Sequence, residues 1–252
     1  RVCDMTSLPP LLHSPEEFPR LSEEDCIAIQ NTLAPYVLQR NTFWEEMPRT
    51  AAGVDLAYWR QGEEEMAVCC VVTVDCQTKQ VVEKRQASGR VAFSYLPGCF
   101  AFRELPLVIA AAAKLREWPD IFVFDGNGIL HPRGMGLAAH ASFYLRAPTM
   151  GVAKHYYRVD GAESAEPGEE PGSFGDIVKE GQVLGRAVRT RRGVKPVFVS
   201  VGNWVTLDTA TRLALQLTGG GSRLPLPTWY ADLETHTQRQ QLREPHRPEK
   251  SE

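Results

Sequence analysis

A chain of 252 residues is long enough to bury a sizeable core as one domain. Its hydrophobic content of 43% and charged content of 23% exclude a disordered chain and are typical of a globular protein. The formal net charge of -3 excludes a domain that binds nucleic acid through bulk positive charge, but it permits an acidic site that holds metal ions.

The cysteine pattern and the hydropathy indicate a reducing compartment. Six cysteines are present, and none has the Cys-X-X-Cys spacing of a zinc site. Cys69 and Cys70 adjoin in a valine-rich run, so they are interpreted as buried, reduced thiols. No apolar run is long enough to cross a membrane, and no apolar segment typical of a signal peptide occurs near the N-terminus. We therefore expect a cytoplasmic protein, or a nuclear one in a eukaryote, with no membrane partner.

The first third of the chain predicts a helix followed by an antiparallel meander. Residues 1–20 are rich in proline and acid and are expected to form a loose arm. Ser22 and the three acids after it predict a helix start, and the helix should reach about Val37 unless Pro35 kinks or ends it earlier. Short polar connections between apolar runs then predict hairpins. The strands joined by these hairpins are expected at 51–59, 66–75 and 80–86.

Beyond residue 100 the hydrophobic period changes from that of strands to that of helices. Apolar residues from Phe102 to Leu115 recur every three or four positions, which predicts a helix. Further helices are expected at 135–146 and 207–217, strands at 121–124, 148–153, 182–189 and 195–201, and a polar loop at 161–175. The polar tail 235–252 is expected to be disordered, which leaves one folded domain over 21–234. This order predicts a mixed sheet with helices on its faces.

Two acids stand at unusual places in the predicted strands. The apolar run Ile121–Phe124 ends on Asp125 and is followed by Gly126-Asn127-Gly128, while Asp55 lies inside the small and apolar run 51–57. Taken singly, each acid is more simply interpreted as a turn residue or a helix cap. Two carboxylates set in apolar strands are costly unless a cation lies between them. Because hard divalent ions take carboxylate oxygens, the pair predicts a metal site.

Glu104 is a third candidate acid. It lies near the start of the predicted helix after Pro97-Gly98, where it could simply cap that helix. A strand-helix-strand crossover could also return it beside Asp55 and Asp125. Three convergent carboxylates that hold one or two divalent ions are typical of phosphodiester cleavage, and Mg²⁺ suits such a site because it keeps waters for the substrate.

Seven short motifs follow one another in order and together carry a family resemblance. They are Gly53-Val54-Asp55, Tyr95-Leu96-Pro97-Gly98, Ala101-Phe102-Arg103-Glu104, Asp125-Gly126-Asn127-Gly128, His131-Pro132-Arg133-Gly134, Gly151-Val152-Ala153-Lys154 and Ser200-Val201-Gly202. The set resembles endonuclease V, a nuclease family that acts near deaminated adenine, hypoxanthine, in nucleic acid. The resemblance covers about residues 51–232 and implies a ribonuclease-H-like fold, a mixed sheet with helices on both faces.

Carried over residue by residue, the resemblance implies a catalytic site with Mg²⁺, for which Mn²⁺ can substitute. The metal-binding acids fall on Asp55, Glu104 and Asp125. Asp232, after Pro225-Leu226-Pro227-Thr228, matches a further polar position of the family, although it could equally be a solvated acid on a terminal helix. His131 and Lys154 match residues beside the scissile phosphate. The alternatives for these two are an ordinary hydrogen-bonding loop histidine and a strand-end lysine turned to solvent.

The resemblance also implies a wedge and a base pocket. The family's wedge falls on Tyr95, Leu96, Pro97 and Gly98, where an aromatic ring can stack in the space left by a displaced base. An ordinary turn with a packed tyrosine is the alternative. The pocket walls fall on Gly98, Phe100, Gly126 and Leu137. Ser94 replaces the family's usual proline, Phe100 its usual leucine and Asn203 its usual histidine, so no chemistry is assigned to Asn203.

A basic cluster near residue 190 has two interpretations. It consists of Arg186, Arg189, Arg191, Arg192 and Lys195. These residues could form a ridge that meets phosphates, or they could be the solvated face of a hairpin.

The expected function is hydrolysis of a phosphodiester 3′ to a hypoxanthine nucleotide, leaving 3′-hydroxyl and 5′-phosphate ends. The expected partner is single-stranded or locally opened DNA or RNA, bound by a monomer. One alternative is a module that binds hypoxanthine-containing nucleic acid without cutting it, but such a module has no need of buried carboxylates. Another is a different ribonuclease-H-like enzyme, such as a junction resolvase or transposase. The loops Tyr95–Gly98 and Asp125–Gly128 count against it, because they would build a base pocket and not a surface for a four-way junction.

Overall fold

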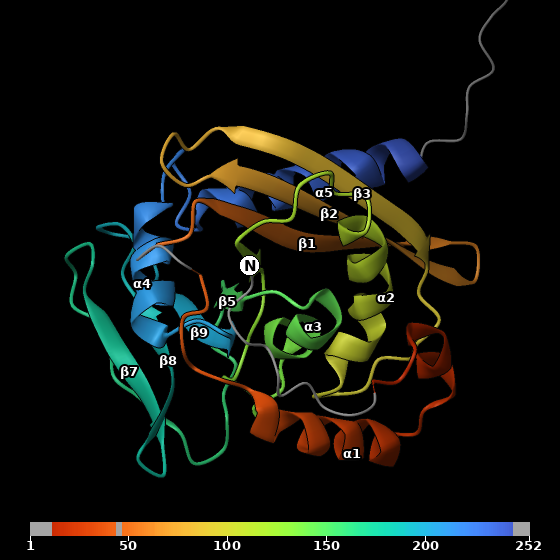
Figure 1. Ribbon diagram of the computed structural model, residues 1–252, viewed down its shortest axis with the longest axis horizontal. Coiled ribbons are helices and arrows are strands. Elements are labelled where there is room, and N and C mark those ends of the chain that lie inside the picture. Colours follow the sequence, from red (N-terminus) through yellow and green to blue (C-terminus); the bar gives the residue numbers. More distant parts are fainter. Residues whose placement is uncertain (1–11, 44–46, 244–252) are drawn as a thin grey trace, which may run out of the picture.

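The computed structural model of this protein describes residues 12–43 and 47–243, and its centre is one mixed sheet (Figure 1). The sheet begins with the predicted meander of three long antiparallel strands, β1 (Thr50–Gln61), β2 (Glu64–Asp75) and β3 (Val81–Arg90). β4 (Ile121–Phe124) then pairs parallel to β1, and β5 (Thr149–Ala153) pairs parallel to β4. The predicted antiparallel meander and mixed sheet are therefore confirmed.

The second half of the sheet is antiparallel again. β9 (Val197–Asn203) pairs with β5, and β8 (Gln182–Val188), β7 (Phe174–Lys179) and β6 (Glu163–Ser164) follow outward. The described strands lie in the order β3-β2-β1-β4-β5-β9-β8-β7-β6. β6 and the start of β7 lie in the segment 161–175, which was expected to be a polar loop. That expectation is wrong at these positions, because the pairing of β6 with β7 and of β7 with β8 compensates for the weak local strand pattern.

Helices cover both faces of the sheet. α2 (Phe100–Ala112) and α3 (Leu137–Leu145) form one core with the sheet, while α4 (Leu207–Gln216) packs on the other face with α5 (Leu226–Arg243) (Figure 1). Alternate residues of β1 and β4 supply the two cores, as the two-residue period of a strand requires. Val54 and Phe124 face α2 and α3. The residue after each of them is an aspartate, Asp55 or Asp125, and it is directed toward the opposite face of the sheet, where α5 lies.

Glycine at position 53 allows α5 to approach the sheet closely. A Cβ atom there would lie 2.0 Å from the carbonyl carbon of Pro227 in the first turn of α5. No side chain fits at that distance, so the backbones of β1 and α5 meet directly. This contact places α5 against the strand that carries Asp55.

The N-terminal helix has the predicted start and an early end. The Ser22 hydroxyl accepts from the Asp25 N–H, and the Asp25 carboxylate accepts from the Ser22 N–H, which together cap α1 (Glu23–Leu33). The helix ends at Leu33, and a 3-10 turn (Ala34–Tyr36) that contains Pro35 follows.

Both predicted terminal segments contain regular structure. Residues 15–20 of the expected loose arm form a 3-10 helix, because Phe18 is fully buried with its ring edge-on to Phe102 at 5.1 Å between ring centroids. Residues 235–243 of the expected disordered tail continue α5, in which Thr235 is buried. Residues 1–11 and 244–252 lie outside the described residues.

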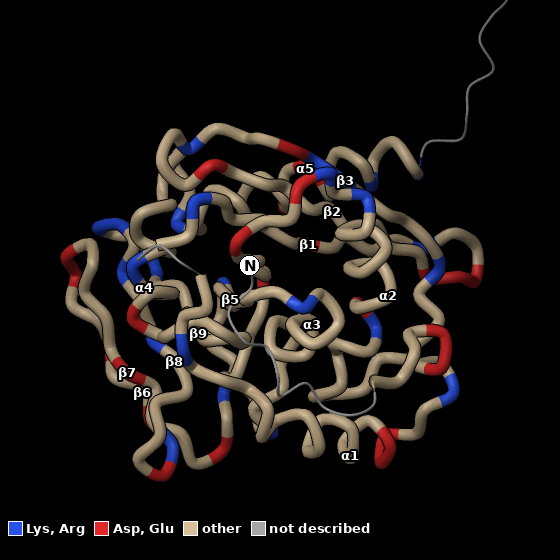
Figure 2. Tube along the Cα trace, viewed as in Figure 1, with Lys and Arg blue, Asp and Glu red and all other residues tan. Residues whose placement is uncertain are grey.

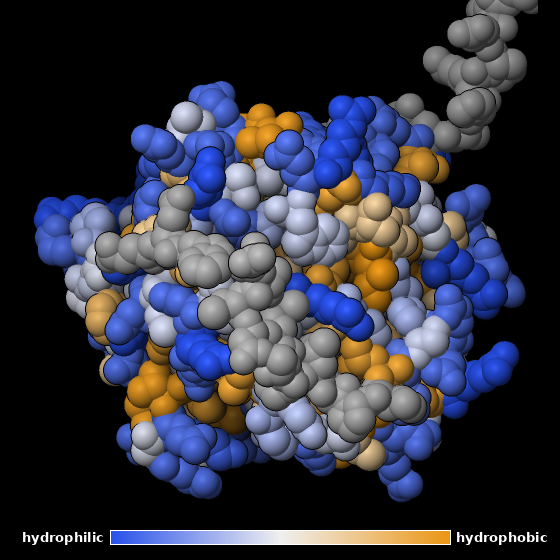
Figure 3. Space-filling model, viewed as in Figure 1, coloured by the Kyte–Doolittle hydropathy of each residue, from blue (hydrophilic) through white to orange (hydrophobic). Residues whose placement is uncertain are grey.

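Charged residues and apolar residues are each distributed over several parts of the molecule (Figure 2 and Figure 3). Lys and Arg are spread over the molecule and interleaved with Asp and Glu (Figure 2). Apolar residues gather in several separate patches on the face shown in Figure 3. Within residues 12–43 and 47–243, no helix combines the length and the apolar character needed to span a membrane.

Candidate active site

Three aspartates converge at one edge of the parallel part of the sheet. Asp55 lies on β1, Asp125 directly follows β4, and Asp232 lies on α5. One carboxylate oxygen from each can be chosen so that all lie within 4.8 Å of one another. The register explains the first two, because Val54 pairs with Phe124 and the two acids come next on neighbouring strands. We call these three residues the carboxylate cluster.

Lys154 lies inside this arrangement rather than in solvent. It follows β5, and its Nζ donates to Asp125 Oδ2 and to Asp232 Oδ1, each at 2.7 Å. Burial disfavours its charged form, but the two carboxylates hold the pKa of Lys154 above its usual range, so the ammonium stays protonated. The alternative of a strand-end lysine turned to solvent is thereby excluded.

The carboxylate cluster concentrates negative charge in a partly buried place. Burial, together with the neighbouring charge of Asp125, raises the pKa of Asp55 to about 6, although the hydroxyl of Thr235 opposes this rise. Burial also raises the pKa of Asp125 against the opposing charge of Lys154. Three hard oxygen donors with a single nearby ammonium fit a divalent cation such as Mg²⁺ or Mn²⁺, which would compensate the remaining charge.

Glu104 approaches from the opposite face of β1. It lies on α2 with only 5% of its surface exposed, and the hydroxyl of Tyr58 donates to its Oε1 at 2.6 Å. Burial raises the pKa of Glu104 to about 8, and the charges of Asp55 and Asp125 add to the rise. Glu104 is not in the first turn of α2, so it does not cap that helix. Asp232, not Glu104, completes the close group of three, and Glu104 as a metal ligand stays a prediction.

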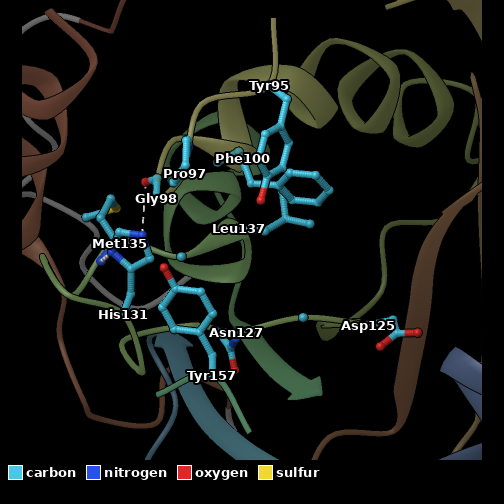
Figure 4. Close-up of a pocket in the computed structure, with 13 residues that line it drawn as sticks. Tyr95, Pro97, Gly98, Phe100, Asp125, Asn127, His131, Met135, Leu137 and Tyr157 are labelled. Atoms are coloured by element: carbon cyan, nitrogen blue, oxygen red, sulfur yellow. Dashed lines mark hydrogen bonds between the residues drawn. The ribbon is translucent and has the colours of Figure 1, made fainter. Parts of the chain in front are cut away.

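A pocket of about 430 Å³ adjoins the carboxylate cluster. Its lining includes Tyr95, Pro97, Gly98, Phe100, Gly126 and Leu137, all predicted from the sequence, while Leu96 packs instead on the core beneath. Figure 4 shows the rings of Tyr95 and Phe100 directed into this space beside Leu137, and Asp125 set apart at its other end. We call it the aromatic pocket. Asp125 is therefore a member of both the carboxylate cluster and the lining of the aromatic pocket.

The loop that carries Tyr95 is anchored at Gly98. Three side chains donate to the Gly98 carbonyl: Gln30 Nε2 at 2.8 Å, Arg133 Nη2 at 2.8 Å and His131 Nε2 at 3.0 Å. The bond from His131 is drawn in Figure 4. Gly98 has φ +74°, which glycine adopts without strain. The side chain of Tyr95 is 66% exposed at the mouth of the pocket. The wedge-like loop is thus held firmly although Ser94 replaces a proline.

His131 lies in the aromatic pocket, not in the carboxylate cluster. Besides the bond from Nε2, its Nδ1 accepts from the backbone N–H groups of Arg133 at 3.2 Å and Met135 at 3.4 Å. Burial and the charge of Arg133 lower the pKa of His131 to about 4, so it is neutral. A neutral ring with both nitrogens engaged offers a phosphate neither charge nor a free N–H. The geometry therefore favours the hydrogen-bonding loop histidine over the predicted phosphate contact.

Tyr157 is a pocket residue that sequence reasoning missed. It lies three residues after Lys154, and its ring stacks on that of His131 with centroids 6.0 Å apart and planes 9° apart. Figure 4 shows it closing the side of the pocket that faces Leu137. Its position depends on the path of the loop after β5, for which the sequence carries no periodic signal.

The arginines of the basic cluster near residue 190 bind other groups of the same chain. Arg186 donates to Asp176 at 2.9 Å and to Asp208 at 2.6 Å. Arg189 and Arg191 bond backbone carbonyls, and Arg192 pairs with Glu170. The arginines brace the β7–β8 hairpin and its neighbours, which favours the hairpin interpretation over a phosphate-binding ridge.

Comparison with known proteins agrees with this arrangement. A family model described as Endonuclease V matches residues 31–233. The chain belongs to the endonuclease V family. Endonuclease V of Bacillus subtilis is 46% identical over 223 residues, which cover 88% of this chain and 94% of that relative.

Solved endonuclease V structures share the fold. The crystal structure of the Bacillus subtilis protein matches with a TM-score of 0.86 at 44% identity and covers 91% of this chain and 97% of its own. Ciona intestinalis endonuclease V, in complex with a 24mer DNA containing an inosine followed by a ribo-adenosine, matches with a TM-score of 0.74 at 25% identity, covering 85% and 96%. The predicted family and the ribonuclease-H-like fold are confirmed, and the family match begins about twenty residues before the resemblance read from the motifs.

Proposed function

We propose that this protein is a metal-dependent endonuclease that hydrolyses a phosphodiester 3′ to a hypoxanthine nucleotide in DNA or RNA, leaving 3′-hydroxyl and 5′-phosphate ends. The observation that carries the proposal is the double membership of Asp125. Because one residue borders both the aromatic pocket and the carboxylate cluster, a base held in the pocket would keep its own backbone next to the acids. Recognition and cleavage would then act on neighbouring groups of one strand.

The aromatic pocket would select the base. Its volume of about 430 Å³ lies within the range of small-ligand sites. The rings of Phe100 and Tyr157 and the side chain of Leu137 give apolar walls, while Gly98 and Gly126 leave backbone close to the base edge. Extracting a base costs a few kcal/mol, and stacking of Tyr95 in the vacated space would offset about 1–3 kcal/mol of this cost. Gln30, Arg133 and His131 would act by holding the Gly98 backbone in place.

The carboxylate cluster would perform the chemistry. Asp55, Asp125 and Asp232 would hold Mg²⁺, or Mn²⁺ in its place, with Glu104 as a further ligand. When bound, the ion would activate water and stabilise negative charge on the phosphate and on the leaving oxygen. Lys154 keeps its proton between two carboxylates and would present a positive charge to the same phosphate. Tyr58 would keep Glu104 Oε1 engaged, so that Oε2 stays available.

The comparisons support the substrate part of the proposal. The Ciona intestinalis relative was solved in complex with a DNA containing an inosine followed by a ribo-adenosine, which supports a hypoxanthine-containing strand as the substrate here. We propose that the chain acts as a monomer on single-stranded or locally opened nucleic acid. A cytoplasmic location, also proposed, is supported by five buried cysteines that carry free thiols.

Cleavage of matched oligonucleotides tests the proposal. Single-stranded DNA and RNA, each with one central hypoxanthine, are incubated with the protein in Mg²⁺ or in EDTA, with guanine in place of hypoxanthine as the control. We expect one cut at a fixed position 3′ to hypoxanthine, only with Mg²⁺, and the better of the two strands identifies the substrate. Hypoxanthine-dependent binding without any cut would contradict the proposal and support a binding module.

A further inference from the structure

A buried hydroxyl on α5 touches the carboxylate cluster. The Oγ1 of Thr235 lies 2.8 Å from Asp55 Oδ2, and Thr235 is fully buried. The same oxygen lies 2.9 Å from the backbone carbonyl of Asp232, one turn earlier. Thr235 also lies beyond the family match, which ends at residue 233. The residue is therefore next to the proposed chemistry, although neither the motifs nor the family match includes it.

The turn 232–235 of α5 directs three side chains at three different parts of the protein. Asp232 reaches Lys154, and Thr235 reaches Asp55 on β1. Glu234 forms an ion pair with Lys84 of β3 at 2.8 Å. The helix is thus tied to the sheet beside the cluster, so the hydroxyl of Thr235 has little freedom to move away from Asp55.

A threonine hydroxyl has one hydrogen and can donate it to one acceptor at a time. The two acceptors within reach are the Asp55 carboxylate and a neutral carbonyl of the same helix. A hydrogen bond to an ionised carboxylate is roughly twice as strong as one to a neutral acceptor. When Asp55 is ionised, the hydrogen therefore goes to Asp55 Oδ2, which fixes this oxygen and leaves Oδ1 available for a cation.

We propose that Thr235 is a positioning residue, which holds the Asp55 carboxylate in the orientation required for divalent-cation binding. The proposal rests on the proposed function and adds that the metal centre includes a turn of α5 beyond the family match. Groups that orient a metal ligand affect metal affinity by about 10–100-fold when they are removed. A purely structural threonine would affect stability without affecting that affinity.

Calorimetric titration of Mn²⁺ into the metal-free, full-length protein tests this role without nucleic acid. Thr235→Val keeps the shape of the side chain and removes the donor, while Thr235→Ser keeps the donor. Thr237→Val, two residues further on the exposed side of α5, is the matched control, since among the described residues its hydroxyl donates only to the Leu233 carbonyl within the helix. We expect Thr235→Val to weaken Mn²⁺ binding by at least about tenfold, and the other two variants to stay near the wild type.

Steady-state kinetics add a second readout that separates the two proposals. In Thr235→Val, the Mn²⁺ concentration for half-maximal cleavage should rise, while the KM for the oligonucleotide stays within about threefold. Unchanged Mn²⁺ affinity in Thr235→Val, or equal losses in Thr235→Ser and Thr235→Val, would overturn the role of Thr235 alone. A wild-type protein that neither binds Mn²⁺ nor cleaves would overturn the proposed function and this inference together.

Discussion

The carboxylate cluster and the aromatic pocket share Asp125, yet they consist of chemically different groups: charged side chains in the cluster, and mainly uncharged ones in the pocket. The cluster brings ionisable side chains on or directly after β1, β4, β5 and α5 into a partly buried place. There, burial raises the pKa of Asp55 and of Asp125, and the carboxylates of Asp125 and Asp232 raise the pKa of Lys154 against the effect of burial. The aromatic pocket uses rings, glycines and a neutral histidine from loops that follow β3, β4 and β5. The cluster is thus suited to holding charge, and the pocket to holding an uncharged planar group.

This difference separates chemistry from selection. Damage to the cluster should abolish cleavage while recognition survives, and damage to the pocket should weaken recognition while metal binding survives. A substitution of Asp125 would affect cleavage and recognition together, because Asp125 belongs to both regions. Substitutions at other positions are therefore needed to separate the two effects.

The largest effect is expected for Asp55→Ala. Removal of this carboxylate leaves the cluster without one of its three acids, so cleavage should fall by roughly three orders of magnitude or more. Hypoxanthine-dependent binding should persist, because Asp55 does not line the aromatic pocket. On one labelled oligonucleotide, single-turnover kinetics measure the cleavage rate and a gel-shift titration measures the binding. Full cleavage by this variant would show that the metal site lies elsewhere.

Leu137→Trp is the matching change in the aromatic pocket. The larger side chain would occupy space beside Phe100, and poor fit of the base should cost about 1–3 kcal/mol, which is roughly 5–150-fold in affinity for hypoxanthine strands. Calorimetric Mn²⁺ binding should be unchanged, and circular dichroism verifies folding. Undiminished preference for hypoxanthine over guanine would rule out the pocket as the selective element.

Gly53→Ala should disturb the cluster through the backbone. The added Cβ would meet the Pro227 carbonyl at 2.0 Å, so α5 must shift and carry Asp232 with it. We expect destabilisation of about 1–3 kcal/mol and reduced cleavage. Gly89→Ala is the control, because the nearest atom there is the flexible end of Leu107 at 3.6 Å. Equal unfolding midpoints for the two variants would argue against close contact between β1 and α5.

The smallest effect concerns pH. Burial raises the pKa of Glu104 to about 8, above its value in an unfolded chain, so ionisation opposes folding as the pH rises from about 4 to 8. In EDTA, Glu104→Gln should therefore be more stable than the wild type at pH 8 but not at pH 5. Its unfolding midpoint at pH 8 should rise by about 2–4 °C for each kcal/mol of ionisation cost that the substitution removes. Differential scanning fluorimetry at both pH values measures this.

Added metal should reverse that trend. Mg²⁺ binds ionised carboxylates, so its stabilisation of the wild type should grow between pH 5 and pH 8. Two outcomes would contradict the assignment of a buried, ionisable Glu104 beside the metal centre. One is an unfolding midpoint of Glu104→Gln at pH 8 in EDTA that is no higher than that of the wild type. The other is a stabilisation of the wild type by Mg²⁺ that is equal at pH 5 and pH 8.

The sequence predicted those parts of the site that follow from local pattern. Asp55 and Asp125 could be identified because each interrupts or ends an apolar strand, and adjacent parallel strands bring such positions together. The motifs supplied most pocket residues. The strands β1, β2, β4 and β5 were predicted within a few residues because buried strands carry nearly continuous apolar runs. The polar strand β3 was predicted from the short hairpin connection before it, and it extends to Arg90, four residues beyond the expected end.

The missed parts depend on tertiary contacts. α5 begins in a Pro-X-Pro-Thr stretch and carries many polar residues, so its pattern resembles a tail, although packing on β1 and the Lys84–Glu234 pair stabilise it. The engagement of both His131 nitrogens and the stacking of Tyr157 depend on loop paths that no period encodes. Asp232 had two equal interpretations in the sequence, and its place beside Lys154 could not be predicted because it depends on how α5 packs.

One experiment tests the separation of selection from chemistry most directly. Wild-type protein is bound in EDTA to oligonucleotides with one central hypoxanthine or guanine, and Mg²⁺ is then added to the same complexes. We predict selective binding of the hypoxanthine strand before the metal is present, followed by a single cut 3′ to hypoxanthine once Mg²⁺ is added. Selectivity that appears only with Mg²⁺, or cutting in EDTA, would contradict the account.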